Sequence, residues 1–174
     1  MDVLYYKDWV VGKWRNFIYH YLPAGYDASK ISDNILISDL STAYNVEEMK
    51  KEGITHIINT VLAIEPAYPQ EFKYLSIHTR DSESEDLKQY FDQCFEFIED
   101  AVKNNAKILI HCIFGRSRSS AIAIAYFIRK SRMSYDDAYT MVKEKRNIIE
   151  PNEGFKGQLK EYAQRWVKRS RKDV

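Results

Sequence analysis

Residues 111–120 read HCIFGRSRSS and lie between two apolar segments of different character. The preceding run, 107–110, reads KILI, which predicts a buried strand. The following run, 121–128, reads AIAIAYFI, which predicts a buried helix. A chain that leaves a buried strand and enters a buried helix through a short polar loop is typical of an α/β fold.

The rest of the chain continues this alternation of strand and helix. Short apolar or β-branched runs predict further strands at 35–37, 54–61 and 72–77. Apolar residues at helical spacing predict helices at 46–52, 86–103, 119–130, 134–146 and 155–169. We therefore expect a central, mostly parallel sheet of four or five strands, flanked by helices. Ligands bind such sheets at the carboxyl ends of the strands, which is where HCIFGRSRSS falls.

Composition restricts the classes of protein that the chain can represent. Its 174 residues are enough for one domain that buries about 70% of its unfolded surface. The net charge is +1, so we expect no nucleic-acid partner. No apolar run approaches the roughly 18 residues of a membrane span, and the N-terminus lacks the pattern of a signal peptide. We expect a cytoplasmic protein, with the nucleus as a second location.

Two terminal segments stand apart from the domain, which we expect over residues 26–170. Residues 1–25 carry aromatic side chains at roughly helical spacing, among them Trp9 and Trp14. We expect this helical extension to pack on its own domain, and a homodimer contact through it is the alternative. Residues 171–174 end a basic tail whose cations suit a helix C-terminus, the alternative being a docking or nuclear-targeting patch.

The sequence of the loop indicates an anion-binding site. Backbone N–H groups at the start of a helix lack intrahelical partners and carry the positive end of the helix dipole. Gly115 can adopt backbone angles that let a loop turn further N–H groups inward. Arg118 presents a planar fork that matches two phosphate oxygens. Cys112 precedes this loop, where the same field favours a thiolate, so the stretch predicts a phosphate-binding loop with a nucleophile at its floor.

Residues 111–119, HCIFGRSRS, resemble the motif of the cysteine-dependent phosphatases, which is cysteine, five residues, arginine, then serine or threonine. Two other segments, YLSIHTRD at 74–81 and RNIIEPNEGFKGQL at 146–159, resemble the compact dual-specificity protein phosphatases. The resemblance covers roughly residues 28–166. It implies an enzyme that hydrolyses phosphotyrosine and phosphoserine or phosphothreonine in phosphoprotein substrates.

The resemblance also implies a role for each residue of the site. Cys112 would be the nucleophile that forms a cysteinyl-phosphate intermediate. Asp81, on a mobile loop, would protonate the leaving oxygen and then activate the hydrolytic water. Ser119 would hydrogen-bond the departing thiolate, His111 would fix the cysteine backbone and favour its thiolate, and Asn152 would support the site from outside.

The same resemblance implies how the phosphoryl group is bound. Its oxygens would be held by the Arg118 side chain and by the main-chain N–H groups of Ile113, Phe114, Gly115, Arg116, Ser117 and Arg118. No metal or cofactor is implied, because these donors neutralise the charge of the phosphoryl group themselves. The four histidines and two cysteines also lack the spacing of a metal site.

Other interpretations of single residues stay open. Cys112 is alternatively a buried structural thiol, and Asp86 is alternatively the N-terminal charge of the next helix. Cys94 is expected in the core, and a redox partner for Cys112 is the alternative. Arg116 is a departure from the pattern, since dual-specificity protein phosphatases commonly carry an aliphatic residue there.

The substrate is less restricted than the reaction. A second arginine in the loop resembles phosphatases of phosphatidylglycerophosphate and related lipids, so a lipid or RNA 5′-phosphatase with the same chemistry is the alternative. A phosphoprotein-binding module of weak activity is the second alternative. Such modules usually lose the nucleophile or the arginine, whereas this chain keeps both Cys112 and Arg118.

Overall fold

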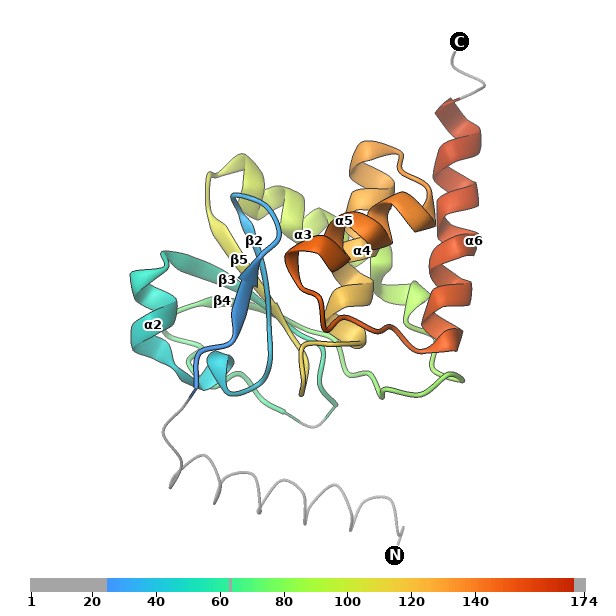
Figure 1. Ribbon diagram of the computed structural model, residues 1–174. Helices are drawn as coiled ribbons and strands as arrows, with labels where there is room; N and C mark the ends of the chain where they lie inside the picture. The colour runs from blue at the N-terminus through green and yellow to red at the C-terminus, as the bar shows by residue number, and fades with distance from the viewer. Residues whose placement is uncertain (1–24, 63, 171–174) are drawn as a thin grey trace, which may run out of the picture.

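The computed structural model describes residues 25–62 and 64–170. Within these ranges one sheet of five strands lies at the centre, in the order β1-β2-β5-β3-β4 (Figure 1). Three neighbouring pairs are parallel and the edge pair β1–β2 is antiparallel, which confirms the mostly parallel sheet. The strands are β1 (Ala28–Lys30), β2 (Ile35–Ser38), β3 (Ile54–Asn59), β4 (Lys73–Ser76) and β5 (Lys107–His111).

The helices that the sequence predicts are present, with two shifted starts. They are α2 (Val46–Lys51), α3 (Phe91–Lys103), α4 (Arg118–Ser131), α5 (Tyr135–Lys145) and α6 (Glu153–Ser170), with the 3₁₀ turns η1 (Thr42–Tyr44) and η2 (Lys88–Tyr90). α3 begins later than expected because η2 occupies the segment before it. α6 begins earlier, because the side chain of Asn152 accepts a hydrogen bond from the N–H of Phe155 at 3.0 Å.

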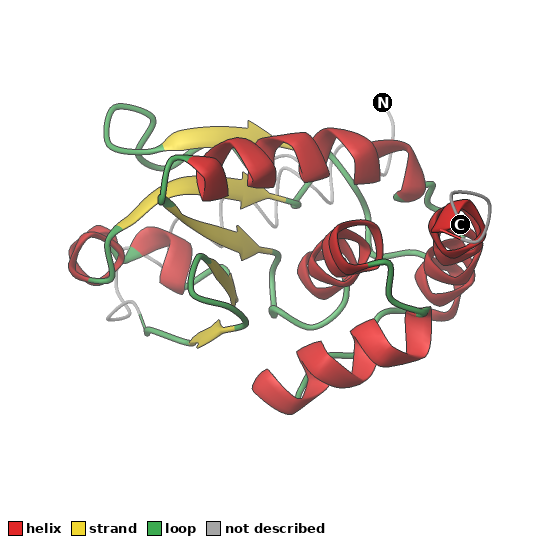
Figure 2. Ribbon diagram, turned by 90° about the horizontal axis from the view of Figure 1, so that it is seen from above, coloured by secondary structure: helices red, strands yellow, loops and turns green. Residues whose placement is uncertain are grey.

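The sheet separates two apolar layers, as the alternation of side chains along its strands requires. On β5, Ile108 and Ile110 face a large cluster that includes residues of α3, α4, α5 and α6. Leu109, between them, faces a smaller cluster that contains Met49 of α2. Figure 2 shows α3 to α6 gathered on one side of the sheet and α2 on the other. The central strand β5 is therefore buried on both faces, which explains its unbroken apolar sequence.

This architecture places the loop at residues 112–117 at the carboxyl end of the central strand. β5 ends at His111 and α4 begins at Arg118, so the loop connects a buried strand directly to the start of a buried helix. Most of the residues of α4 are buried, including its first nine. The loop is therefore fixed at both ends by the core.

The strand β1 is present although the sequence did not predict it, because its three residues, ASK, carry no apolar alternation. The aromatic segment over residues 1–25, with Trp9 and Trp14, falls almost entirely outside the described residues, and so do residues 171–174. The N-terminal helix, its homodimer contact and the role of the basic tail therefore stay predictions. Among the described residues, no helix is long and apolar enough to cross a membrane.

Candidate active site

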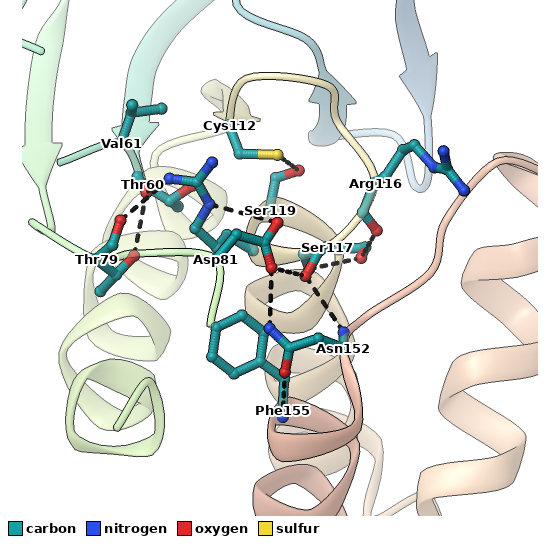
Figure 3. Close-up of polar contacts among 12 residues, drawn as sticks. Thr60, Val61, Thr79, Asp81, Cys112, Arg116, Ser117, Ser119, Asn152 and Phe155 are labelled. Atoms are coloured by element: carbon teal, nitrogen blue, oxygen red, sulfur yellow. Dashed lines mark hydrogen bonds and ion pairs between the residues drawn. The ribbon is translucent and has the colours of Figure 1, made fainter. Parts of the chain in front are cut away.

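The sulfur of Cys112 lies at the floor of the loop and is held by two donors. The residue is 1% exposed. Its Sγ accepts a hydrogen bond from the N–H of Gly115 at 3.1 Å. It accepts a second from the hydroxyl of Ser119 at 3.3 Å (Figure 3). Both donors come from the loop and the first turn of α4, and both stabilise negative charge on the sulfur. The predicted contact between Ser119 and Cys112 is present.

Gly115 gives the loop its curvature. Its φ of +63° lies in the left-handed region that other residues rarely adopt. A Cβ atom on Gly115 would also lie 2.7 Å from the carbonyl carbon and oxygen of Ser38 in β2. Both the backbone angle and the space therefore require glycine at this position.

The guanidinium of Arg118 is buried and anchored by backbone carbonyls from two other segments. Its Nη1 donates to the carbonyl oxygens of Thr60, just after β3, at 3.3 Å and of Thr79, after β4, at 3.1 Å. Its Nε is buried and has no hydrogen-bond partner within the described part of the chain. Oδ2 of Asp81 lies 3.8 Å from this Nε, an ion pair too long for a hydrogen bond, so the buried N–H is suited to donate to an incoming oxyanion.

Asp81 is held over the loop by three groups. Its Oδ1 accepts hydrogen bonds from the hydroxyl of Ser117 at 2.6 Å and from Nδ2 of Asn152 at 2.9 Å (Figure 3). Its Oδ2 lies 3.8 Å from Nε of Arg118. The N–H of Asn152 also donates to the Ser117 hydroxyl at 3.3 Å, which closes the network. The structure thus brings together residues from three separate segments that the sequence predicted for one site.

His111 is buried beneath the loop with its ring neutral. Burial lowers the pKa of its imidazole to about 4. At neutral pH the ring therefore adds no positive charge below Cys112, and its Nδ1 lacks a hydrogen-bond partner among the described residues. Its backbone is fixed, because its carbonyl oxygen accepts from the N–H of Thr60 at 3.1 Å and from the Thr60 hydroxyl at 2.8 Å.

The side chains of Ile113, Phe114 and Arg116 differ in their surroundings. Phe114 is 71% exposed, which leaves only its backbone for the phosphoryl group. Arg116 is exposed and turned away from Cys112 and Asp81 in Figure 3, with its Nε donating to the carbonyl of Ile148 at 3.2 Å. Ile113 packs against the apolar cluster that contains Leu40 and Cys112. Phe114 and Arg116 therefore form the exposed rim of the loop, whereas Ile113 packs beside its floor.

One buried residue that supports the loop was not predicted. Arg146, at the end of α5, is 3% exposed, and its Nε donates to the carbonyl of Gly115 at 2.9 Å. Its Nη atoms donate to both carboxylate oxygens of Asp27, at 2.9 and 2.7 Å, and to the hydroxyl of Ser29 at 3.0 Å. These hydrogen bonds lower the pKa of Asp27. The segment 146–159 was recognised in the sequence, but no local pattern indicated that its first residue is buried.

Cys94 is a core thiol. It lies in α3, 1% exposed, within the large cluster between the sheet and the helices. Burial raises the pKa of its thiol to about 12, so it is uncharged at neutral pH. Cys112 belongs to a different cluster, and both thiols are free. Within residues 25–62 and 64–170, no group of three His, Cys, Asp or Glu side chains could hold a metal ion.

The chain matches the model of the dual specificity phosphatase catalytic domain over residues 36–165. Dual specificity protein phosphatase 1B of Arabidopsis thaliana is 36% identical over 141 residues, which are 81% of this chain and 84% of that protein. Human protein phosphatase Slingshot homolog 1 is 37% identical over 134 residues, 77% of this chain but only 13% of that longer protein.

Solved structures agree with the sequence relatives. The crystal structure of human tyrosine phosphatase-like serine/threonine/tyrosine-interacting protein superposes with a TM-score of 0.76 at 34% identity, covering 80% of this chain and 97% of that chain. Human DUSP28 superposes with a TM-score of 0.75 at 28% identity, covering 82% and 97%. The chain belongs to the dual specificity phosphatase family. It is a protein phosphatase that hydrolyses phosphotyrosine and phosphoserine or phosphothreonine monoesters.

Proposed function

We propose that hydrolysis passes through a phosphate covalently bound to Cys112, with Asp81 as the proton donor and acceptor. The observation that carries this proposal is the meeting of three groups at one loop. Sγ of Cys112 accepts hydrogen bonds from Gly115 and Ser119, Nε of Arg118 makes no hydrogen bond within the described residues, and the Asp81 carboxylate lies 3.8 Å from that Nε.

In the first step the phosphoryl oxygens bind the loop N–H groups and the guanidinium of Arg118, whose Nε exchanges the carboxylate of Asp81 for substrate. The thiolate of Cys112 attacks phosphorus and a sulfur–phosphorus bond forms. The bond from phosphorus to the substrate oxygen breaks, and protonated Asp81 gives its proton to that oxygen. The loop donors stabilise the charge that develops on the transferred group.

In the second step Asp81, now a carboxylate, takes a proton from water while the water oxygen attacks phosphorus. The sulfur–phosphorus bond breaks, and inorganic phosphate and the thiolate are released. The hydroxyl of Ser119, 3.3 Å from Sγ, is positioned to stabilise the departing thiolate. Asn152 and Ser117 would hold Asp81 within reach of both reactions through their hydrogen bonds to its Oδ1.

The physiological substrate is proposed as a phosphoprotein in which a second negative charge lies near the phosphoresidue. The support is the side chain of Arg116, an exposed cation of the loop whose Nε donates to the carbonyl of Ile148. A panel that compares turnover of phosphopeptides, phospholipids and 5′-triphosphate RNA tests this choice. Faster turnover of the lipid or the RNA than of the peptides would overturn it.

Turnover of an aryl phosphate by the wild type and by Cys112→Ser tests the mechanism. We expect no turnover by the serine variant, because the weaker nucleophile cannot form the intermediate, while vanadate binding stays within a few-fold of wild type. Vanadate binding is the control for an intact loop. Turnover that persists in the serine variant would show that Cys112 is not the nucleophile.

A further inference from the structure

The segment that carries Asp81, residues 81–88, runs along the start of α6; we call it the acid loop. Its expected mobility stays a prediction, and the structure shows contacts with α6 or the residue before it at the beginning, middle and end of the loop. At its beginning, Asp81 accepts the hydrogen bond from Asn152, the residue that precedes α6. A change in the distance between the rest of the acid loop and α6 would therefore move Asp81.

In the middle of the acid loop the backbone of Glu83 lies directly against Gly154. A Cβ atom on Gly154 would lie 2.0 Å from the carbonyl oxygen of Glu83, 2.6 Å from its carbonyl carbon and 2.7 Å from its Cα. All three are backbone atoms, so no side-chain rotation can relieve the overlap. The backbone of Gly154 does not have the positive φ seen at Gly53 and Gly115. Glycine is needed here for space and not for its conformational freedom.

At its end the acid loop is held by both ends of one amide side chain. Nε2 of Gln158 donates to the carbonyl of Glu85 at 2.7 Å, and its Oε1 accepts from the N–H of Lys88 at 2.8 Å. Gln158 lies four positions after Gly154, so the two residues share a face of α6. This face of α6 therefore contacts the backbone of the acid loop at Glu83, Glu85 and Lys88.

We infer that Gly154 and Gln158 are positioning residues that set the place of Asp81 over the phosphate-binding loop. This inference rests on the proposed role of Asp81 as general acid. Any side chain at 154 must widen its distance to the carbonyl oxygen of Glu83 from 2.0 Å to at least 3.4 Å to restore ordinary contact, and Glu83 is only two residues from Asp81. A misplacement of about 1 Å in a catalytic group can cost on the order of 10²-fold in rate.

The test compares Gly154→Ala with Gly157→Ala on the same helix. Gly157 is exposed and has nothing within 4 Å of a Cβ, so alanine there changes helix propensity without touching the acid loop. The readout is kcat/KM for p-nitrophenyl phosphate, whose leaving group needs little protonation, and for phenyl phosphate, whose leaving group needs the acid. For Gly154→Ala we expect a loss of roughly 10- to 100-fold on phenyl phosphate and less than about threefold on p-nitrophenyl phosphate. Gly157→Ala should match wild type on both.

A double variant separates this inference from the role of Asp81. Gly154→Ala should cause no further loss on phenyl phosphate when Asp81 is already Asn, because both changes remove the same proton transfer. Equal losses on both substrates, or losses that multiply in the double variant, would overturn the positioning role. If Asp81→Asn itself causes no loss, the assignment of the general acid fails, and the inference fails with it.

Gln158→Ala provides a second test that adds no bulk. It removes both hydrogen bonds that hold the end of the acid loop, and we expect it to lower kcat/KM on phenyl phosphate more than on p-nitrophenyl phosphate. Thermal unfolding of each variant is measured in parallel. Equal losses of kcat/KM on both substrates, accompanied by a fall in Tm, would identify a role in stability alone. That result would overturn the inference.

Discussion

Nε of Arg146 donates a 2.9 Å hydrogen bond to the carbonyl oxygen of Gly115, 31 positions earlier in the chain. The same guanidinium binds the carboxylate of Asp27, near the edge strand β1. The phosphate-binding loop is therefore tied, through one buried cation, to the edge of the sheet and to the end of α5. Nη2 of Arg146 would also lie 2.6 Å from a Cβ at position 115, so the contact depends on glycine there.

Arg146→Lys should lower the free energy of unfolding by roughly 1–3 kcal/mol, because one ammonium group cannot reach all the acceptors that the buried guanidinium binds. Denaturation in urea measures this loss. Affinity for vanadate should fall as well, since the carbonyl of Gly115 loses its partner. Lys145→Ala, at the exposed neighbouring position, is the matched control and should leave both measurements unchanged. Wild-type stability and vanadate affinity in Arg146→Lys would show that the tie is dispensable.

Asp81→Asn should reduce kcat/KM on phenyl phosphate by roughly 10²–10⁴-fold, because the amide cannot donate an acidic proton to the leaving oxygen. Asp86→Asn is the control. Asp86 accepts from the N–H of Gln89 at 3.3 Å at the start of η2, as its alternative interpretation predicts, and it should affect activity little. The general acid would have to be reassigned if Asn at Asp86, or Gln at Glu83 or Glu85, caused the larger loss.

Arg116→Val should leave kcat on a plain aryl phosphate nearly unchanged, because its guanidinium binds the carbonyl of Ile148 and not the transferred group. KM for substrates with a second negative charge should rise several-fold, since a partly exposed charge pair contributes about 0.2–1 kcal/mol or more. The difference should shrink with added salt. Arg116→Lys, which keeps the charge, should behave like wild type. An equal loss on both substrates would assign Arg116 to the structure of the loop.

His111 should make stability depend on pH. Its folded pKa of about 4 lies below the ordinary value of 6.5, so between these values the unfolded chain binds the extra proton. The free energy of unfolding therefore rises with pH across this window, is fully present above about 6.5 and is lost as pH falls toward 4. Between pH 7.5 and pH 5 the expected loss from this residue is roughly 2 kcal/mol.

Urea denaturation of the wild type and His111→Gln at both pH values checks this prediction. The loss between the two pH values should be smaller in the variant by that amount. Part of the loss should remain, because burial also lowers the pKa of His56. An identical pH dependence in the two proteins would mean that His111 titrates normally in the folded state.

Most of the fold could be predicted because its elements have strong local patterns. β5 contains a short unbroken apolar run and α4 a longer one, and the alternation of strands and helices along the chain implies a parallel sheet. β1 escaped prediction because its three residues form a strand only by pairing with β2. The start of α3 was misplaced because residues 88–90 follow the helical pattern but form a 3₁₀ turn under the contact with Gln158.

The sequence by itself determined the chemistry predicted for the loop, since Cys112, Gly115, Arg118 and Ser119 lie within one short segment and each has a role that follows from its own side chain or backbone. Asn152 was also predicted as a support, but the tertiary structure alone decided the main-chain contacts that hold the loop and the segment of Asp81 in place. The carbonyls of Thr60 and Thr79 that anchor Arg118, and the backbone of Glu83 against Gly154, are main-chain groups of distant segments. Any residue type can supply a carbonyl, so such contacts leave no pattern in the sequence and arise only when the packed sheet and helices bring the segments together.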